Sequence, residues 1–272
     1  THPFPEGAAA LWRMRHGGAF ALAALLTDYA LHAIWLVRGV DQYFVATNTM
    51  ADEMAERGFD PHTVRATGIP IVRANYSLAR EAAQKQAGLT EDLPTLLLMG
   101  GGLGLGGMDR TLAALEEVEQ RLSILVVAAR NAALEAHARS AACSSRHVIR
   151  VFSYTDQVSV LMRAADLLIT KPGGLTISEA FAAGLPLLLH DPIPGPETEN
   201  AIYATRRGAA VWLHPGERMA PAVEEILAHR IPAMRRAARD CACEDAARHV
   251  ADTLTGMLTR KRGQMHGTEK NT

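Results

Sequence analysis

The chain has 272 residues, 48% hydrophobic and 21% charged, a globular composition that excludes wholesale disorder. Lys and Arg total 28 and Asp and Glu total 29, so the formal net charge of −1 excludes a general electrostatic attraction to nucleic acid. The three cysteines, an odd number in a long chain, predict free thiols in a reducing compartment and not a disulfide framework.

The first 73 residues predict part of an α/β domain. Strands are expected at 20–27, 42–46 and 63–67, and a helix is expected at 48–58, where it ends at a glycine. The apolar run at 17–37 has Asp28 and His32 near its middle, and a carboxylate at a bilayer centre costs about 2.5–3.5 kcal/mol. This run therefore predicts a helix, a buried strand and a loop, not a membrane span.

From residue 94 onward the pattern predicts a complete, doubly wound α/β domain. Short runs that are apolar throughout alternate with helical patterns, which is typical of parallel strands buried on both faces. The expected strands are 95–99, 122–129, 147–152, 165–170, 185–190 and 209–213, and the expected helices are 108–121, 131–141, 156–164, 176–183 and 197–207. We therefore predict domains at 1–73 and 74–256, followed by a polar tail at 257–272.

A glycine-rich turn at 100–107 follows the strand predicted at 95–99. Six of its eight residues are glycine, so the backbone amides can approach an anion closely. Gly102, Gly104 and Gly107 fit the G-x-G-x-x-G pattern, which also occurs in turns that serve only strand–helix packing. No Lys-Ser or Lys-Thr pair follows, so the turn is not a P-loop.

A second glycine turn lies in the segment 171–179, Lys-Pro-Gly-Gly-Leu-Thr-Ile-Ser-Glu. Gly173 and Gly174 leave exposed amides near the start of the next helix, where the helix dipole favours an anion. The alternative is a capping box with Thr176 as the N-cap and Glu179 at N3, which does not explain the paired glycines. Both glycine turns follow strands, at the edge where open α/β sheets bind ligands, so we predict a diphosphate-bearing ligand.

A third loop, 191–200, contains three prolines and brings Glu197 and Asn200 to the same edge of the sheet. These polar side chains suit a polyhydroxyl ligand, although acids at a helix N-terminus are also favoured by the dipole alone. The sequence has no D-x-D pair to hold a divalent metal against a diphosphate. Backbone amides and a helix N-terminus would then stabilise a departing diphosphate.

Four stretches, 100–104, 151–154, 171–179 and 191–195, together with Glu197 and Asn200, closely resemble the diacylglycerol glycosyltransferases of glycosyltransferase family 28. These include monogalactosyldiacylglycerol synthase and the processive diacylglycerol glucosyltransferases. Asp28, His32 and Trp35 resemble the end of that family's N-terminal domain. The resemblance implies the GT-B fold, an α/β fold with a complete Rossmann-like C-terminal domain and, in this chain, a partial Rossmann-like N-terminal domain.

The resemblance also implies a site for a UDP-sugar donor, with Glu179 accepting hydrogen bonds from the ribose hydroxyls. Glu197 and Asn200 would address the transferred sugar, and Asp28, His32 and Trp35 would lie on the acceptor side. The implied nucleotide-binding residues are Gly101, Gly102, Gly104, Phe152, Ser153, Gly173, Gly174, Leu175, Thr176 and Glu179.

The implied reaction moves a hexose with inversion from the UDP-sugar to a diacylglycerol-type lipid at a membrane surface. It needs no cofactor and no metal, and it takes place on the inner face of the plasma membrane, in the cytoplasm. The identity of the sugar, the general base and the oligomeric state stay open. Two alternatives are a catalytically incomplete UDP-sugar-binding module and an NADP-dependent oxidoreductase that uses Gly102, Gly104 and Gly107, with Arg130 for the 2′-phosphate.

Overall fold

A computed structural model describes residues 2–17, 20–72, 76–100 and 107–268, with the side chains described as far as residue 259. The chain divides into two compact units: Thr1–Ile71 with Cys243–Thr272 (unit 1), and Val72–Ala242 (unit 2). This division runs close to the predicted boundary after residue 73 and groups residues 243–256 with unit 1. The assignment of an acceptor-side and a donor-binding domain stays a prediction.

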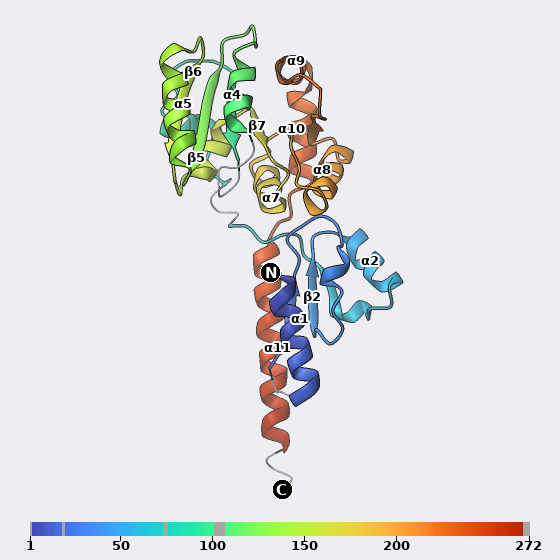
Figure 1. Ribbon diagram of the computed structural model, residues 1–272. Helices are drawn as coiled ribbons and strands as arrows, with labels where there is room; N and C mark the ends of the chain where they lie inside the picture. Colours follow the sequence, from blue (N-terminus) through green and yellow to red (C-terminus); the bar gives the residue numbers. More distant parts are fainter. Residues whose placement is uncertain (1, 18–19, 73–75, 101–106, 269–272) are drawn as a thin grey trace. The chain divides into compact units, whose positions relative to one another are not determined.

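Unit 2 contains a parallel sheet of six strands in the order β6-β5-β4-β7-β8-β9 (Figure 1). Each strand forms where the sequence predicts one, because each apolar run is buried between two layers of helices. The strands are β4 (Thr95–Met99), β5 (Ser123–Ala129), β6 (Val148–Ser153), β7 (Leu167–Thr170), β8 (Leu187–Leu189) and β9 (Ala210–Trp212). The predicted α/β class with a parallel sheet is confirmed.

The five helices predicted in unit 2 are present, and their bounds differ from the expected ones by one to six residues. The expected helix 108–121 ends at Leu115, after which the Glu119 amide donates to the Glu224 carboxylate over 2.8 Å. The helix expected from residue 176 begins at Gly174 with Gly173 as its N-cap. The helices of unit 2 are α3 (Arg80–Gln86), α4 (Met108–Leu115), α5 (Ala132–Ser144), α6 (Val158–Ala164), α7 (Gly174–Ala183), α8 (Pro196–Arg206), α9 (Met219–Glu225), the π-helix η4 (Ile226–Arg230) and α10 (Ile231–Asp240).

The core of unit 2 fixes the strand ends that carry the loops. Leu98 of β4 and Val126 of β5 are almost fully buried in one cluster with Leu112 of α4 and Val223 of α9. Burying one such side chain stabilises the fold by about 1.5–3 kcal/mol. The strands and helices therefore form a rigid base from which the loops at the strand ends project.

Unit 1 contains a parallel sheet of three strands, which were all predicted, in the order β1-β2-β3. One expectation was wrong: the described part of the run 17–37 contains a strand and a 3-10 turn, and the helix lies before it, at Pro3–His16. His2 and Pro3 set that helix start, because the His2 ring accepts from the Phe4 amide at 3.3 Å. The elements are α1 (Pro3–His16), β1 (Ala23–Leu25), η1 (Ala33–Trp35), β2 (Gln42–Val45), α2 (Asn48–Glu56), η2 (Pro61–Thr63), β3 (Val64–Ala66) and α11 (Ala246–Thr268).

The C-terminal segment returns to unit 1 through a close backbone approach. Gly68 has a φ of +80°, and a Cβ there would lie 2.4 Å from the Cβ of Cys243. The segment expected as a polar tail from residue 257 is helical as far as Thr268. Within the described residues, no helix is both long enough and apolar enough to cross a membrane. Cys143, Cys241 and Cys243 are free thiols, as predicted.

Candidate functional site

The carboxyl ends of the six parallel strands of unit 2 meet at one edge of the sheet, which we call the carboxyl edge. Two non-glycine residues at this edge have positive φ: Ala129 at 53°, ending β5, and Asp191 at 45°, two residues after β8. Such backbone conformations are uncommon outside glycine, and they cluster at ligand sites. The strain marks the carboxyl edge as the candidate site.

The N-terminus of α7 presents backbone amides at the centre of the carboxyl edge. Gly173 is the N-cap without a side-chain capping bond, and the first helical bond runs from the Ile177 amide to the Gly173 carbonyl over 3.0 Å. The amides of Gly174, Leu175 and Thr176 precede that ladder, at the positive end of the helix dipole. The capping-box alternative is wrong, because Thr176 lies inside the helix and caps nothing.

Glu179 lies one turn further along α7, half-buried, with Tyr76 as a hydrogen-bond donor to its carboxylate. Burial raises the pKa of Glu179, and the Tyr76 hydrogen bond lowers it in part. Tyr76 itself is 8% exposed, and burial followed by the Glu179 charge raises its pKa. The pair presents a fixed acceptor near the helix N-terminus, which suits a hydroxyl-bearing ligand.

The end of β6 carries Phe152 and Ser153, two of the nucleotide-binding residues that the resemblance implies. Phe152 is partly buried and pairs in register with Val127, and Ser153 is exposed. The Ser153 hydroxyl donates to the Glu135 carboxylate over 2.8 Å; Arg139 and then Ser153 lower the pKa of Glu135. The backbone groups of both residues lie at the carboxyl edge, and their contact with a nucleotide stays a prediction.

Two exposed groups flank this strand end and complete its surroundings. The Arg130 guanidinium, directly after β5, lies 5.1 Å from the centroid of the Tyr154 ring. Tyr154 is 69% exposed, so its ring is free to meet a planar ligand. Sequence reasoning did not assign Tyr154 a role, although its place directly after a predicted strand was a usable signal.

The loop before α8 uses its polar residues to hold its own shape. The Glu197 carboxylate accepts from the Ile193 amide at 2.6 Å, as an acid at a helix start can. Asn200 is fully buried, and its side-chain amide donates to the Pro172 carbonyl over 3.1 Å. Asn200 thus joins this loop to the turn before α7. The direct contacts of Glu197 and Asn200 with a sugar stay predictions.

A cavity of about 300 Å³ opens at the same edge, between the start of α4 and the ends of β8 and β9. Its size is at the lower end of small-molecule sites. The His190 Nδ1 lies 3.3 Å from the Asp191 Oδ2, so a polar pair lies in its wall. Its polar lining comes from Arg110, Thr111, Glu117, His190, Asp191, His214, Glu217 and Arg218.

The remaining predicted residues are placed outside this edge or outside the described chain. Gly101, Gly102 and Gly104 lie outside the described residues. In unit 1, the His32 Nδ1 accepts from the Ile34 amide at 3.3 Å and so caps η1, while Trp35 is 7% exposed and packs in the core. Asp28 is half-buried. An acceptor-side role for Asp28, His32 and Trp35 stays a prediction.

Tyr76 is the contact of Glu179 that the sequence did not reveal. It lies near the start of unit 2, in a polar stretch with no periodic pattern to place it. An aromatic residue among polar ones was the only signal. Its partner was fixed by the path of the chain through unit 2.

Comparison with known families matches most of the chain. Residues 1–71 match the family model described as monogalactosyldiacylglycerol (MGDG) synthase, and residues 95–250 match the glycosyltransferase family 28 C-terminal domain. The processive diacylglycerol beta-glucosyltransferase of Bacillus licheniformis is 32% identical over 226 residues, 83% of this chain and 59% of that protein. The Bacillus cereus protein of the same name is 32% identical over 255 residues, 92% of this chain and 66% of that protein. The chain thus spans less than two thirds of the length of these relatives.

Comparison with solved structures gives the same fold. MurG of Acinetobacter baumannii has a TM-score of 0.69 at 20% identity, over 93% of this chain and 71% of its own. HepE of Anabaena, solved in complex with UDP, has a TM-score of 0.64 at 13% identity, over 94% of this chain and 77% of its own. The GT-B type of fold is confirmed by these likenesses. The oxidoreductase alternative finds no support among these relatives.

Proposed function

Because the chain belongs to glycosyltransferase family 28, we propose that it transfers a hexose from a UDP-sugar to a diacylglycerol-type lipid, with inversion at the anomeric carbon. The observation that carries this proposal is the geometry of α7, with amides at its N-terminus and Glu179 one turn further on. This arrangement offers donors to a diphosphate and an acceptor to a ribose on one rigid helix. The named activity of the Bacillus relatives supports the same donor and acceptor classes.

In this mechanism the helix N-terminus stabilises the departing UDP. Charge develops on the leaving diphosphate as the bond to the anomeric carbon breaks, and the amides of Gly174, Leu175 and Thr176 are oriented before the reaction. The helix dipole adds to this, without a cofactor or a metal. An acceptor hydroxyl attacks from the opposite face of the sugar and loses its proton to a general base.

The lipid side of the proposal draws on unit 1. Helix α1 exposes large apolar side chains to solvent: Phe4 and Met14 are 70% exposed and Trp12 is 52% exposed. Basic residues, Arg15 among them, lie in the last turn of the same helix. Exposed aromatic and basic side chains on one helix suit the interface of an anionic membrane. A peripheral position on the inner face of the plasma membrane follows from this proposal.

A second candidate is a UDP-sugar-binding module that does not catalyse. Its supporting observation is that His32, the histidine nearest the acceptor-side segment, uses its Nδ1 to cap η1. This bond occupies the lone pair with which the His32 ring would accept a proton. Both candidate functions use the same donor site, and they differ only in whether the sugar is transferred to an acceptor.

A transfer assay on the full chain separates the two candidates. The chain is incubated with radiolabelled UDP-glucose or UDP-galactose and vesicles that contain diacylglycerol, and the lipid extract is counted. We expect labelled glycolipid with one of the two donors, lost in Glu179→Ala and kept in Glu56→Gln, which removes an exposed acid from α2. UDP binding without labelled lipid would instead support the module. Absence of UDP binding would overturn both.

A further inference from the structure

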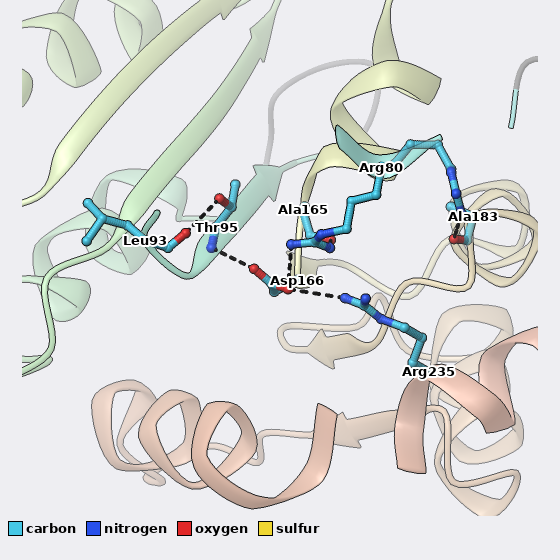
Figure 2. Close-up of polar contacts among 8 residues, drawn as sticks. Arg80, Leu93, Thr95, Ala165, Asp166, Ala183 and Arg235 are labelled. Atoms are coloured by element: carbon cyan, nitrogen blue, oxygen red, sulfur yellow. Dashed lines mark hydrogen bonds and ion pairs between the residues drawn. The ribbon is translucent and has the colours of Figure 1, made fainter. Parts of the chain in front are cut away.

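A cluster of arginines surrounds a small cavity at the opposite, amino edge of the sheet of unit 2. The cavity measures about 40 Å³, and four of its lining residues are Arg80, Arg163, Arg235 and Arg239. They come from α3, α6 and α10 and converge beside Asp166, the residue directly before β7. Figure 2 shows Arg80 and Arg235 approaching Asp166 from two sides.

Asp166 is the carboxylate that orders this cluster. Its Oδ1 accepts from Arg80 at 2.6 Å and from Arg235 at 3.2 Å, and its Oδ2 accepts from the Thr95 amide at 3.0 Å (Figure 2). Arg80 also donates to the Ala165 carbonyl over 2.8 Å. Asp166 therefore compensates part of the charge of two arginines and fixes where their guanidinium groups lie.

The other two arginines add charge that Asp166 does not pair. Arg163 donates to the carbonyls of Leu78 and Ala183, each over 2.9 Å, so its partners are neutral. Arg239 forms no ion pair within the described part of the chain, and it lies across Gly184, where a Cβ would come within 2.8 Å of its Nε. Burial, then the charges of Arg239 and Arg80, lower the pKa of Arg163, an effect that Glu81 partly opposes.

The charge balance favours a dianion. Four guanidinium groups face the carboxylates of Asp166 and Glu81, which leaves a surplus of two positive charges. The Nε of Arg235 is buried and has no partner among the described residues. Like charges held together in a partly buried site repel each other, so the empty cluster costs stability that an oxyanion would restore.

We propose that this cavity, the arginine pocket, binds a phosphate-class dianion. The cavity of about 40 Å³ exceeds the roughly 30 Å³ that one water takes up in the liquid. Its wall of guanidinium groups suits a small tetrahedral oxyanion. Guanidinium groups match phosphate oxygens with two parallel hydrogen bonds each. The same chemistry is offered by free inorganic phosphate and by the monoester headgroup of phosphatidate.

The arginine pocket is separate from the proposed donor site. Strand β7 runs from Asp166 at one edge to Thr170 and the α7 turn at the other, and four strand residues span roughly 13 Å. An anion in the arginine pocket therefore leaves the α7 amides free for UDP. Binding at the two places is distinguishable because only one of them is blocked by UDP.

The test measures binding of sodium phosphate to the full chain at constant ionic strength, with and without saturating UDP. The readout is calorimetric heat together with the thermal midpoint, which rises with ligand by mass action. We expect saturable phosphate binding that UDP does not block. We expect about tenfold weaker binding in Arg239→Gln, partial recovery in Arg239→Lys, and no change in Arg236→Gln, which like Arg239 is an exposed arginine of α10 but does not line the pocket.

Arg239→Gln keeps the Asp166 network intact and removes one repelling charge, so its thermal midpoint in chloride buffer should be no lower than that of the wild type and should report a folded protein. Equal losses in Arg239→Gln and Arg236→Gln would overturn the proposal, as would phosphate that competes with UDP or that does not bind. A parallel flotation with vesicles of phosphatidylcholine, with and without phosphatidate, separates the two sources. Retention by phosphatidate that free phosphate reverses and Arg239→Gln abolishes supports a headgroup, and phosphate binding without such retention supports the free ion.

Discussion

The two edges of the six-stranded sheet offer an anion different binding groups. At the carboxyl edge the groups offered are backbone amides at the start of α7 and one carboxylate, Glu179. At the amino edge they are the four guanidinium groups of the arginine pocket around Asp166. Toward an anion, the start of α7 presents neutral dipoles and the arginine pocket presents fixed charges, although both belong to one compact unit.

Helix α7 joins the two edges and explains much of the contrast. Its positive N-terminus lies at the carboxyl edge, and the carbonyl of Ala183 in its last turn accepts from Arg163 at the other. A helix dipole favours anions at its start and cations at its end. The difference teaches that one helix can favour an anion at its start through its backbone dipoles while guanidinium groups gather at its end.

Removing Glu179 should give the largest effect on the carboxyl edge. Hydrogen bonds to charged groups contribute about 1.5–3 kcal/mol, so Glu179→Ala should weaken UDP about 10- to 100-fold in calorimetry. Phosphate binding in the arginine pocket should not change. Unaltered UDP affinity in Glu179→Ala would remove the ribose role from this residue.

Salt should separate the two edges next. Fixed charges near a surface are screened by ions, so phosphate in the arginine pocket should weaken about tenfold between about 0.05 and 0.5 M sodium chloride. UDP at the α7 amides should weaken less than about threefold over the same range. Parallel titrations at each salt concentration measure this, and equal slopes would contradict the contrast between dipoles and charges.

Tyr76→Phe should shift the pH dependence of UDP binding. Burial raises the pKa of Glu179 above its ordinary value of 4.5, and the protonated carboxyl loses acceptor capacity, so UDP affinity should fall on acidification from a pH above 4.5. The Tyr76 hydrogen bond lowers this pKa, so Tyr76→Phe should move the fall to higher pH. Titrations between pH 5 and 8, in steps of about half a unit, follow the fall. A merely structural Tyr76 would lower affinity equally at every pH.

Glu6 in unit 1 lies outside both edges and should change stability without changing binding. It is 6% exposed, the hydroxyl of the neighbouring Tyr43 donates to the Val37 carbonyl, and burial raises the pKa of Glu6 to about 7. Its protonated form is favoured in the fold, so its contribution is complete below pH 4.5 and is lost as the pH rises through 7.

Between those limits the free energy of unfolding of the wild type should fall by about 2–3 kcal/mol relative to Glu6→Gln. Urea denaturation followed by tryptophan fluorescence measures it. A parallel pH dependence of the two proteins would exclude Glu6 as the cause. UDP and phosphate affinities of Glu6→Gln should equal those of the wild type.

Most of the fold of unit 2 could be predicted because its strands are buried on both faces. A short run that is apolar throughout, such as 95–99, is typical of a strand buried on both faces. Strand β4 has the predicted bounds. The three strands of unit 1 were equally visible. Helices α3, α9 and α10 were missed because their patterns are short or polar. Contacts distant in sequence, such as that of Arg80 with Asp166, help to stabilise such helices.

The parts of the candidate site that consist of backbone amides could be predicted from the sequence. The parts that consist of side chains from distant segments could not. Gly173 and Gly174 identified the amides at the start of α7. The hydrogen bond of Tyr76 to Glu179 could not be predicted, and neither could the position of Arg239 beside Gly184. Both contacts join segments that are far apart in the sequence, and a local sequence pattern gives no information about them. Asn200 shows the converse, since a residue chosen for its polarity is fully buried against the Pro172 carbonyl.

Amide resonances of the isotope-labelled chain during a UDP titration test the central claim most directly. A phosphate at the start of α7 must shift the Gly174, Leu175 and Thr176 amides, because they would donate to it. We expect these three signals to move saturably together, with the resonance of the Arg239 side chain unchanged. Shifts confined to the cavity around Arg110 and His214, with α7 silent, would contradict the claim that this helix holds the donor.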